Sequence, residues 1–504
     1  MVDVNGGSTL AQSVTAGPPG REDHSLLRRE MGRLDTVFFL ISAMVVMDTI
    51  GAIAIAGAQA FTWLVVLFVL FFVPTAFISA ELGAAIPEEG GAYVWVSRAF
   101  GRFWGALTSL LYWAGTPVWL GGSVTVVAIA VVEGFFAPLA LPGAYAVGSV
   151  LIVAATIAAV VPLRVGKWVP TSGAVAQIAL LTFFVVSVGV YAARHGVHGI
   201  QPQEFTPSTA VLIGVVPVLL YSFVGVELPT TAAEEMHDPQ RDIPVAIGQA
   251  GVALALMYAV PVLAVLLVLP AERITTLHGL TDALKSVLTV YGGEVHADGS
   301  VILRGAGRLL GWATAAVFLW VLLSSGTTWI MGASRAQSAA CLDGAGPRSL
   351  GRISRRTGVP VVMALVSGGL ALLTMTVDLT VTGGNAQRYF SAALTLSIAL
   401  IVLAYLMIFP AFLRLRRTEA ALHRPVRVPG GRPGAWLVTA LSTGWSALVA
   451  CCLLWPGLGT ADPDRHLPPG FAGERLMFEA LVITPIVGVV LVVALYLRLT
   501  RPAK

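Results

Sequence analysis

The chain has 504 residues, of which 56% are hydrophobic and 12% are charged, and its formal net charge at pH 7 is +4. Soluble globular proteins carry about 25% charged residues, so this composition excludes an ordinary soluble domain and indicates a membrane protein. The small excess of basic residues does not require a nucleic-acid partner, because the loops between membrane spans account for it.

The first 33 residues lack the apolar core of a signal peptide and are expected to form a flexible cytoplasmic tail. Twelve apolar blocks of membrane-spanning length follow. Their approximate limits are 36–62, 62–86, 100–133, 143–163, 168–193, 209–229, 243–269, 306–334, 359–382, 388–413, 433–456 and 476–498. The run 36–86 is divided by helix length alone. We therefore predict an all-α integral membrane protein with twelve spans in the lipid bilayer.

The distribution of basic residues predicts the orientation of these spans. With the N-terminus in the cytoplasm, 23 of the 31 lysines and arginines lie on the cytoplasmic side and 8 on the outer side. Cytoplasmic loops are rich in these residues, so both termini are expected in the cytoplasm of a cell-membrane protein. The basic loop 416–432 is interpreted as a topology anchor rather than a nucleic-acid or lipid site. The polar outer loop at about 270–305 is long enough to hold a short helix.

The first span contains the stretch MDTIGAIAIAGAQAF, in which Asp48 precedes Gly51 and Gly57. A charge inside a span is costly and usually faces a cavity or a partner. Glycines let the backbone depart from a helix, and the groups this frees are tolerated at membrane depth where they meet a ligand. Amide groups at the start of the next half-helix would suit a carboxylate. The alternative is that the glycines serve close helix packing, which leaves Asp48 unexplained.

A similar interruption falls in the sixth span, VPVLLYSFVGVELPTTAAEE, where Gly225 is followed by Glu227 and Pro229. The two interrupted spans are five apart. Corresponding weak points in two halves of a chain are typical of an inverted-repeat transporter with a site near the middle of the membrane. This repeat is inferred from positions alone.

Motifs of catalysis are absent from the sequence. It contains no His-Glu-x-x-His, no Gly-x-Ser-x-Gly and no phosphate-binding loop, and GAGRLLG at 305–311 lacks the preceding strand of a dinucleotide site. Cys341, Cys451 and Cys452 provide neither a disulfide framework nor metal-ligand spacing. We therefore expect neither an enzyme nor a bound cofactor or metal.

Three longer stretches resemble one transporter family. They are SAELGAAIPEEGGAYVWVSRAFG (79–101), YSFVGVELPTTAAEEMHDPQRDIPVAI (221–247) and GASRAQSAACLDGAGPRSLGRISRRTGVP (332–360). In order and in predicted side they are similar to the loop after the second span, the sixth span with its following loop, and the end of the eighth span of the amino acid–polyamine–organocation family. The resemblance covers roughly residues 34–455, and at the first span it extends to polyamine-type members.

The resemblance implies a LeuT-like fold of two inverted five-helix repeats, with the first and sixth helices unwound around a central substrate. It divides the chain into a core at 34–415 with halves at about 34–194 and 207–415, the basic loop 416–432, two further helices within 433–498, and a tail at 499–504. The substrate-binding residues it implies are Asp48, Thr49, Ile50, Gly51, Ala52, Ile53, Tyr221, Ser222, Phe223, Val224 and Gly225.

Within this implied site, amides of Gly51-Ala52-Ile53 stand where the family has a Gly-Ser-Gly-like segment that holds the substrate carboxylate, although Ile53 departs from that pattern. Carbonyls around 221–224 would accept from the substrate ammonium, and Phe223 stands at the position of an aromatic gate. Asp48 is a substrate ligand, a proton carrier or a permanent partner for a protein donor. Glu227 is a second candidate for proton coupling or a residue that holds the unwound segment together.

Ion coupling is expected to use protons or exchange rather than sodium. Hydroxyls of the eighth span could ligate sodium or line the pocket, but such groups more often bond their own backbone or a neighbouring helix. The hydroxyls in question belong to Ser324, Ser325 and Thr328.

Together these features predict a secondary transporter of amino acids or related small amines that works by alternating access. The alternatives are a transport-inactive sensor or assembly subunit, and a channel-like facilitator of small organic solutes. A channel is expected to line its pore with continuous polar rings, whereas the polar residues here gather at two helix breaks.

Overall fold

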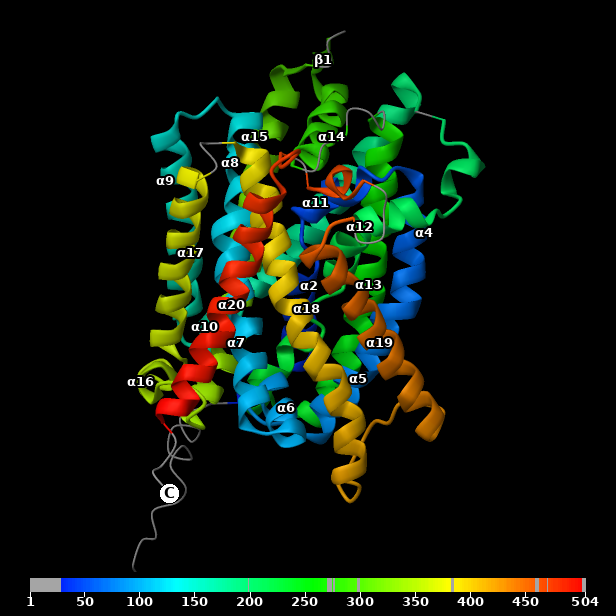
Figure 1. Cartoon of the computed structure of the whole chain (residues 1–504). Coiled ribbons are helices and arrows are strands. Elements are labelled where there is room, and N and C mark those ends of the chain that lie inside the picture. The colour runs from blue at the N-terminus through cyan, green and yellow to red at the C-terminus, as the bar shows by residue number, and fades with distance from the viewer. Residues whose placement is uncertain are drawn as a thin grey trace, which may run out of the picture.

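Long apolar helices packed side by side build the molecule, as Figure 1 shows for this computed structural model. The structure describes residues 29–197, 199–269, 274, 277–296, 300–381, 385–457, 462–468 and 470–500. Residues 1–28 of the predicted tail, and residues 501–504 at the other end, lie outside this part. The tail prediction is wrong at its end, because Met31 is 1% exposed and bridges to Met236, and because helix α2 already begins at Arg33.

Ten helical segments in the described ranges are long and apolar enough to cross a membrane. Their elements are α4 (Ala58–Leu67) with the π-helical turn η1 (Phe68–Phe72) and α5 (Val73–Ala85), α7 (Arg102–Trp119) with the π-helical turn η2 (Leu120–Val124) and α8 (Thr125–Phe135), α9 (Leu141–Ala159), α10 (Leu163–Gly166) with α11 (Trp168–His195), α13 (Pro239–Val268), α15 (Gly305–Leu342), α17 (Val361–Val381), α18 (Ala386–Thr418), α19 (Gly431–Leu454) and α20 (Arg475–Leu499). They match ten of the twelve predicted spans.

The predicted first and sixth spans are broken helices instead of single long ones. The first consists of α2 (Arg33–Met44) and α3 (Thr49–Ala54), and the sixth of α12 (Thr209–Tyr221) and the 3₁₀ helix η4 (Leu228–Glu235). The predicted boundary at residue 62 is wrong, because Gly57 has a φ of 63° and turns the chain from α3 into α4. Glycine tolerates this left-handed conformation, so the second span begins at Ala58.

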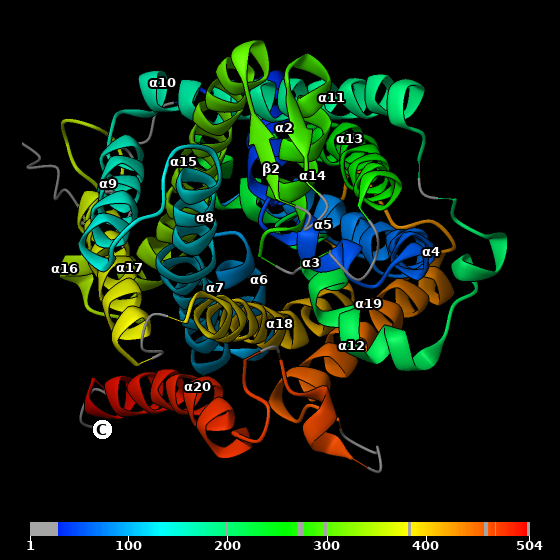
Figure 2. The same cartoon turned by 90° about the horizontal axis from the view of Figure 1, so that it is seen from above.

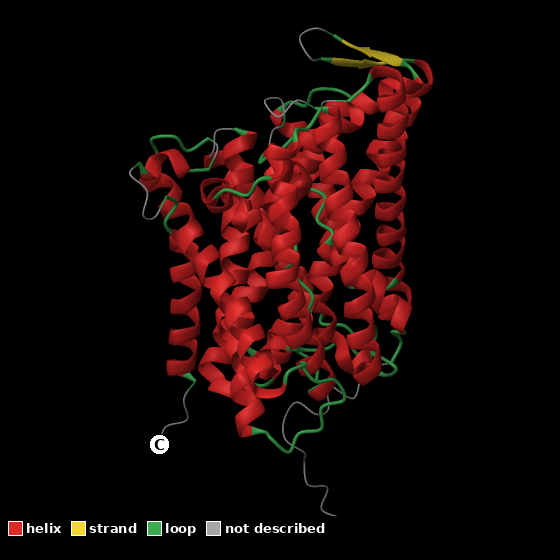
Figure 3. Cartoon of the chain, turned by 90° about the vertical axis from the view of Figure 1, so that its right-hand side faces the viewer, coloured by secondary structure: helices red, strands yellow, loops and turns green. Residues whose placement is uncertain are grey.

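Short elements cap the two ends of the bundle. One end carries α14 (Gly279–Leu288), the 3₁₀ turn η6 (Thr289–Tyr291) and a hairpin of β1 (Gly293–Val295) and β2 (Val301–Leu303), in which Glu294 pairs with Ile302. Figure 3 shows this hairpin projecting at the end opposite the C-terminus. The helix was expected in this loop, but the hairpin was not. The remaining short elements are α6 (Ala92–Phe100), η3 (Pro202–Phe205), α16 (Arg348–Gly351) and η7 (Pro463–His466).

Packing places the broken helices inside the bundle. α2 contacts α13, α11 and α15, while α3 contacts α13, α14 and α12. α18 packs against α7 and α19, and α9, α17 and α20 lie at the rim, as the view in Figure 2 shows. The two predicted weak points are therefore surrounded by protein rather than by lipid, as irregular backbone at membrane depth requires.

Candidate functional site

The two helix breaks lie next to each other, and one tryptophan touches both. Trp329 on α15 donates a hydrogen bond from Nε1 to the carbonyl of Ala43, in the last turn of α2, at 2.9 Å. Its ring also faces Gly225, where a Cβ atom would come within 3.0 Å of it. Gly225 has a φ of 101°, a conformation that favours glycine. Backbone conformation and Trp329 therefore both exclude a side chain at this position.

Side chains from two other helices bind the backbone groups that the first break frees. The Tyr258 hydroxyl on α13 donates to the Met44 carbonyl at 3.0 Å and accepts from the Val46 N–H at 2.8 Å. The Gln177 side chain on α11 donates to the Val45 carbonyl. Buried backbone groups cost free energy unless they are hydrogen-bonded, so these contacts stabilise the break. They also occupy carbonyls that would otherwise be available to a ligand.

Asp48 is the last residue of this break, at the N-cap position of α3, and is 3% exposed. Its Oδ2 atom accepts hydrogen bonds from Trp119 Nε1, at 3.2 Å, and from the Ser123 hydroxyl. Its Oδ1 atom has no hydrogen-bond partner within the described residues. A carboxylate oxygen left without a donor inside a membrane protein is costly, and such groups mark sites for ligands or protons.

The third span is distorted where it meets Asp48. Pro117 inside α7 has no N–H to donate, and the π-helical turn η2 begins three residues later. On the same turn, a Cβ atom at Gly122 would lie 2.0 Å from the Cβ of Ala393 on α18, so glycine permits this close packing. The distorted segment carries both Trp119 at its start and Ser123 within it. The two donors to Asp48 thus come from one irregular turn.

Glu227, the acid of the second break, is 1% exposed and has a different environment. The Tyr405 hydroxyl on α18 lies 3.0 Å and 2.9 Å from its two carboxylate oxygens. The same hydroxyl accepts a hydrogen bond from the Gly225 N–H at 3.1 Å. Glu227 and Tyr405 together therefore connect the break to α18, which is the arrangement expected of a group that holds an unwound segment in place.

The structure places Thr49, Ile50, Gly51, Ala52 and Ile53 in helix α3, all of them buried. The expectation that the backbone is unwound at Gly51 is wrong, because the break lies earlier, at 45–48. Gly51 instead lies in close contact with α14, where a Cβ atom on Gly279 would come within 3.1 Å of the Gly51 Cα atom. That an amide of this first helical turn holds a carboxylate remains a prediction.

The predicted residues of the sixth span lie at the end of α12 and in the break after it. Tyr221 is the last residue of α12, and the Ser222 hydroxyl donates to the Val218 carbonyl at 3.1 Å. Val224 and Phe223 are buried. The ring of Phe223 packs against Phe68 and Phe72 of η1, with centroid distances of 6.0 and 5.8 Å. Phe223 is thus engaged with the second span, and its role as a gate remains a prediction.

The three predicted hydroxyl residues of the eighth span lie on α15, and two of them contact Ser42 of α2. Ser42 Oγ is 3.1 Å from Ser324 Oγ and 3.0 Å from Thr328 Oγ1. Ser324 also donates to the Val169 carbonyl and Thr328 to the Ser324 carbonyl, each at 2.8 Å. Ser325 Oγ is buried with no hydrogen-bond partner in the described ranges. Two of the three hydroxyls are therefore engaged in contacts with their own backbone or with neighbouring helices.

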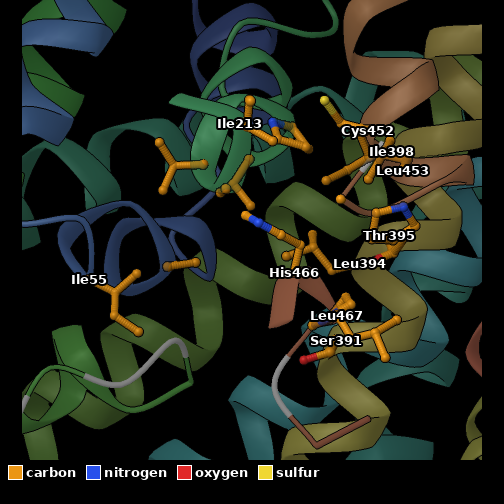
Figure 4. A pocket seen from close by; sticks show the side chains of 18 of the residues that line it. Ile55, Ile213, Ser391, Leu394, Thr395, Ile398, Cys452, Leu453, His466 and Leu467 are labelled. Atoms are coloured by element: carbon orange, nitrogen blue, oxygen red, sulfur yellow. The ribbon is translucent and has the colours of Figure 1, made fainter. Parts of the chain in front are cut away.

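A cavity of about 410 Å³ lies on the side of the bundle that carries the hairpin. It begins at Ala52 of α3 and at Ile55, directly after that helix, and continues between α12, α18 and the ends of α19 and α20. Figure 4 shows His466 pointing into it opposite Ile55, with Leu394 and Thr395 of α18 on its wall. Ala52 is the predicted site residue that borders this space.

The opposite end of the bundle is closed by charge pairs. Buried Glu81 on α5 accepts from Arg416 Nε at 2.8 Å and from the Val428 N–H at 2.7 Å. Arg335 Nε donates to Glu235 at 2.8 Å. Further pairs join Arg33 to Asp242, at 3.0 Å, and Lys167 to Asp35, at 2.8 Å. The described structure therefore has a cavity toward one face and a network of ion pairs at the other.

Sequence reasoning did not include the partners of the two acids in the site. Trp119 and Ser123 bind Asp48, Tyr405 binds Glu227, and Tyr258 holds the first break. Tyr405 and Tyr258 stand in the middle of long apolar runs, where a hydroxyl needs a partner, and this was the available signal. Which group each hydroxyl would reach depends on how distant helices pack.

The sequence model described as amino acid permease matches residues 31–468. A protein from Lactococcus lactis subsp. lactis, named as a probable agmatine/putrescine antiporter, is 25% identical over 418 residues, which are 82% of this chain and 83% of that protein. The glutamate/gamma-aminobutyrate antiporter of the same organism is 23% identical over 439 residues, or 83% of this chain and 81% of that protein.

Among solved structures, the manganese transporter of Eremococcus coleocola is similar, with a TM-score of 0.57 and 11% sequence identity. The match covers 97% of this chain and 99% of that one. At this identity the likeness concerns the fold alone.

Proposed function

Because this chain belongs to the amino acid permease family, and is a membrane transporter rather than an enzyme, we propose that it is a secondary active transporter of amino acids or related small amines. It moves them across the cytoplasmic membrane by proton coupling or exchange. Asp48 carries the proposal. A carboxylate that keeps one oxygen unpartnered, beside two adjacent helix breaks, has the chemistry to receive a substrate ammonium.

The substrate would bind with its amine at Asp48 Oδ1. The carbonyls of Ala43, Met44 and Val45 are occupied by protein donors, so they leave the carboxylate as the acceptor at the first break. A substrate carboxylate, where present, would meet the amides in the first turn of α3. Two relatives named for agmatine/putrescine and for glutamate/gamma-aminobutyrate support an amine-bearing substrate.

The architecture we propose has twelve spans in two inverted halves of five helices, at about 34–194 and 207–415, followed by two further helices. The broken α2–α3 and α12–η4 would be the first helix of each half. Both termini would lie in the cytoplasm, on the side of the ion-pair network, because most lysines and arginines belong to that side.

Alternating access would follow from moving the two broken helices relative to the rest. The cavity beside Ala52 supports a path toward the outer face, and the ion pairs of Arg335 and Glu81 support a closed inner face. Opening the inner face would break these pairs while closing the cavity. This alternation would carry a bound amine across without a continuous pore.

Exchange or proton coupling is favoured over sodium. The hydroxyls of Ser324 and Thr328 bond Ser42 on α2 and backbone carbonyls instead of forming an open set of ligands. Both relatives are named as antiporters, which supports exchange. Asp48 would in that case serve mainly as the substrate ligand and Glu227 as the group that stabilises the sixth-span break.

The experiment is uptake into liposomes that contain the purified protein. Labelled agmatine, putrescine, glutamate and gamma-aminobutyrate are each offered with and without internal substrate, and with and without a pH gradient. We expect saturable, exchange-stimulated or gradient-driven uptake of at least one amine, lost in Asp48→Asn and retained in Glu133→Gln, a matched control near the outer end of α8. The absence of saturable flux for a wide panel of amines would contradict the transporter and favour a sensor. Flux that never saturates would favour a channel-like facilitator.

A further inference from the structure

A buried charge cluster lies at the closed end of the bundle, away from the acids of the two breaks. It joins Glu89 from the loop between α5 and α6, Glu234 and Glu235 from η4, and Arg335 from α15; we refer to these four residues as the inner gate. Arg335 donates from Nε and Nη2 to the two oxygens of Glu235, at 2.8 and 3.2 Å. The Glu89 N–H donates to Glu234 Oε1 at 3.1 Å. Three separate segments therefore meet through these charges.

The segments are also pressed together by shape. A Cβ atom at Gly90 would lie 2.7 Å from the Cβ of Ala339 on α15, and one at Gly91 would lie 2.4 Å from the Thr230 hydroxyl of η4. The loop that carries Glu89 thus packs closely against both partners at these two glycines. Any opening of the inner face at this point has to separate the loop from η4 and α15.

Glu89 has one carboxylate oxygen without a partner. The residue is 5% exposed, and its Oε1 lies 3.9 Å from Arg335 Nε, beyond hydrogen-bond distance. Oε2 is buried and accepts no hydrogen bond from the described residues. The side chain therefore lies inside the cluster but takes no donor from it. Protonation lowers the cost of burying this side chain, because a neutral carboxyl group has no charge to solvate.

The charge balance leads to the same conclusion. Glu89 and Glu235 are both more than nine-tenths buried, Glu234 is half-buried, and Arg335, 2% exposed, is the basic group that faces them. Arg335 forms its two close contacts with Glu235. Burial, and after it the negative charge of Glu235, raises the pKa of Glu89 well above its usual range, although the Arg335 charge opposes this shift.

Other charged groups near the gate interact with residues other than Glu89. Glu30, in the segment before α2, interacts with Glu235. Glu88 is exposed and pairs with Arg98 of α6. Neither provides a positive charge to Glu89, so the closed gate holds three carboxyl groups against one guanidinium.

We propose that Glu89 is a proton-binding site of the inner gate, which holds a proton while the gate is closed and releases it to the cytoplasmic water when the gate opens. The O–H bond of the Glu89 carboxyl breaks, water accepts the proton, and the carboxylate is then solvated. The role of this proton in transport rests on the proposed function, whereas the test below does not require transport.

The direction of the pH effect follows from this linkage. The closed gate binds the proton more tightly than the open gate, so closing takes up a proton and acid favours the closed form. As pH rises from the Glu89 pKa of the open form toward that of the closed form, opening becomes more favourable. One linked proton changes the opening equilibrium by at most about tenfold per pH unit.

The test measures access to position 339 by thiol labelling. Ala339→Cys is introduced into full-length protein whose Cys341, Cys451 and Cys452 are replaced by alanine, in lipid nanodiscs without substrate. Labelling by a water-soluble maleimide is followed from pH 5.5 to 8.5. Each rate is divided by that of an exposed Ser349→Cys reference on α16, which removes the intrinsic pH dependence of the thiol. We expect the normalised rate to rise with pH, by up to about tenfold per unit.

The variants decide which residue is responsible. Glu89→Gln keeps the shape of the neutral form, so we expect a low rate that no longer responds to pH. Glu88→Gln, on the neighbouring exposed acid, is expected to keep the wild-type response. A full pH response in Glu89→Gln, or loss of the response in Glu88→Gln as well, would overturn the proposal. Should Glu89→Gln fail to fold, Glu89→Asp is expected to keep a response with a shifted midpoint, and an unshifted midpoint would overturn the proposal.

The measurement also separates this proposal from the transport function. A pH-dependent gate in a protein that transports no amine would leave the proton site standing and contradict the transporter. Amine flux together with labelling that does not respond to pH would support the transporter and contradict the proton site at Glu89.

Discussion

The two helix breaks look alike in sequence but differ in what their acids contact. Each break has a glycine and an acid within a few residues, Asp48 with Gly51 and Glu227 with Gly225. Asp48 keeps one carboxylate oxygen without a partner in the described structure, whereas both oxygens of Glu227 lie within 3.0 Å of the Tyr405 hydroxyl. Burial is nearly the same for both, so the difference lies in their hydrogen-bond partners.

We propose that this difference gives similar motifs different roles. A carboxylate that already satisfies a tyrosine and, through it, a backbone N–H has little capacity left for a ligand. A carboxylate with an open oxygen retains that capacity. The acid and glycine alone therefore locate a break, and the partners of the acid determine whether the break binds a ligand or is simply stabilised.

The largest effect is expected on transport. Asp48→Asn removes the charge that would pair with a substrate ammonium, and loss of one partner of a buried charge pair costs about 2–5 kcal/mol, so uptake of the transported amine should fall by about 30-fold or more. Glu227→Gln keeps an acceptor for Tyr405 and should retain at least about a third of the wild-type uptake by the same reasoning. Initial uptake rates into liposomes measure the effects of both variants. Equal losses of uptake would contradict the different roles proposed for Asp48 and Glu227.

The glycine of the second break should be the next most sensitive position. Gly225→Ala forces a side chain into a φ of 101° and against the Trp329 ring, so we expect a loss of about 2–3 kcal/mol of stability. Gly189→Ala on α11, where nothing lies within 4 Å of the added atom, is the control and should be neutral or slightly stabilising. Thermal unfolding in detergent compares the two, and a Gly225→Ala protein as stable as Gly189→Ala would contradict the geometry.

A smaller effect is expected for the clamp on the second break. Tyr405→Phe leaves the Gly225 N–H and Glu227 without their shared partner, which should lower stability by about 1–3 kcal/mol. Glu227→Gln and Tyr405→Phe act on one network, so their effects should not add when combined. A double variant whose loss equals the sum of the single losses would show that the residues act independently.

The donor to Asp48 can be tested in the same way. Trp119→Phe removes the indole N–H at 3.2 Å from Oδ2 and should weaken amine uptake by about tenfold, since hydrogen bonds to charged groups contribute about 1.5–3 kcal/mol. Trp113→Phe removes a similar bond to Ser367, on a helix away from Asp48, and should change uptake less than about threefold. A larger loss of uptake in Trp113→Phe than in Trp119→Phe would indicate that the substrate amine binds away from Asp48.

Sodium is expected to have the smallest effect of all. Replacing sodium with choline should leave uptake unchanged, and Thr328→Ala should not create or remove an ion dependence, because Thr328 bonds Ser42 and its own helix. A steep dependence of uptake on sodium, lost in Thr328→Ala, would show that these hydroxyls ligate the ion.

The apolar blocks predicted ten of the spans, because membrane helices need long runs without charge and such runs are visible in sequence. Asp48 and Glu227 place a charge inside two of these runs, and their positions therefore indicated the two broken helices. The first break was expected at Gly51 but lies at 45–48, and this segment contains no glycine or proline that would have indicated it. Tyr258 and Gln177 stabilise it from α13 and α11, and such contacts between distant helices leave no local pattern.

The site was predicted as a list of backbone positions, and the structure changes which groups are available. Gly51 was expected to open the helix but instead packs against Gly279. The carbonyls of the first break are occupied by Trp329, Tyr258 and Gln177, which sequence spacing could not pair with them. The single unpartnered oxygen of Asp48 emerged only when all of these contacts were known.

The most direct test of the difference between the two acids is equilibrium binding of the amine that the liposome panel identifies, to Asp48→Asn and to Glu227→Gln, in detergent by titration calorimetry. With Asp48 as the ligand, its variant should bind at least about 30-fold more weakly than the wild type, and the Glu227 variant within about threefold of it. Wild-type affinity in Asp48→Asn, with weak binding in Glu227→Gln, would contradict this account.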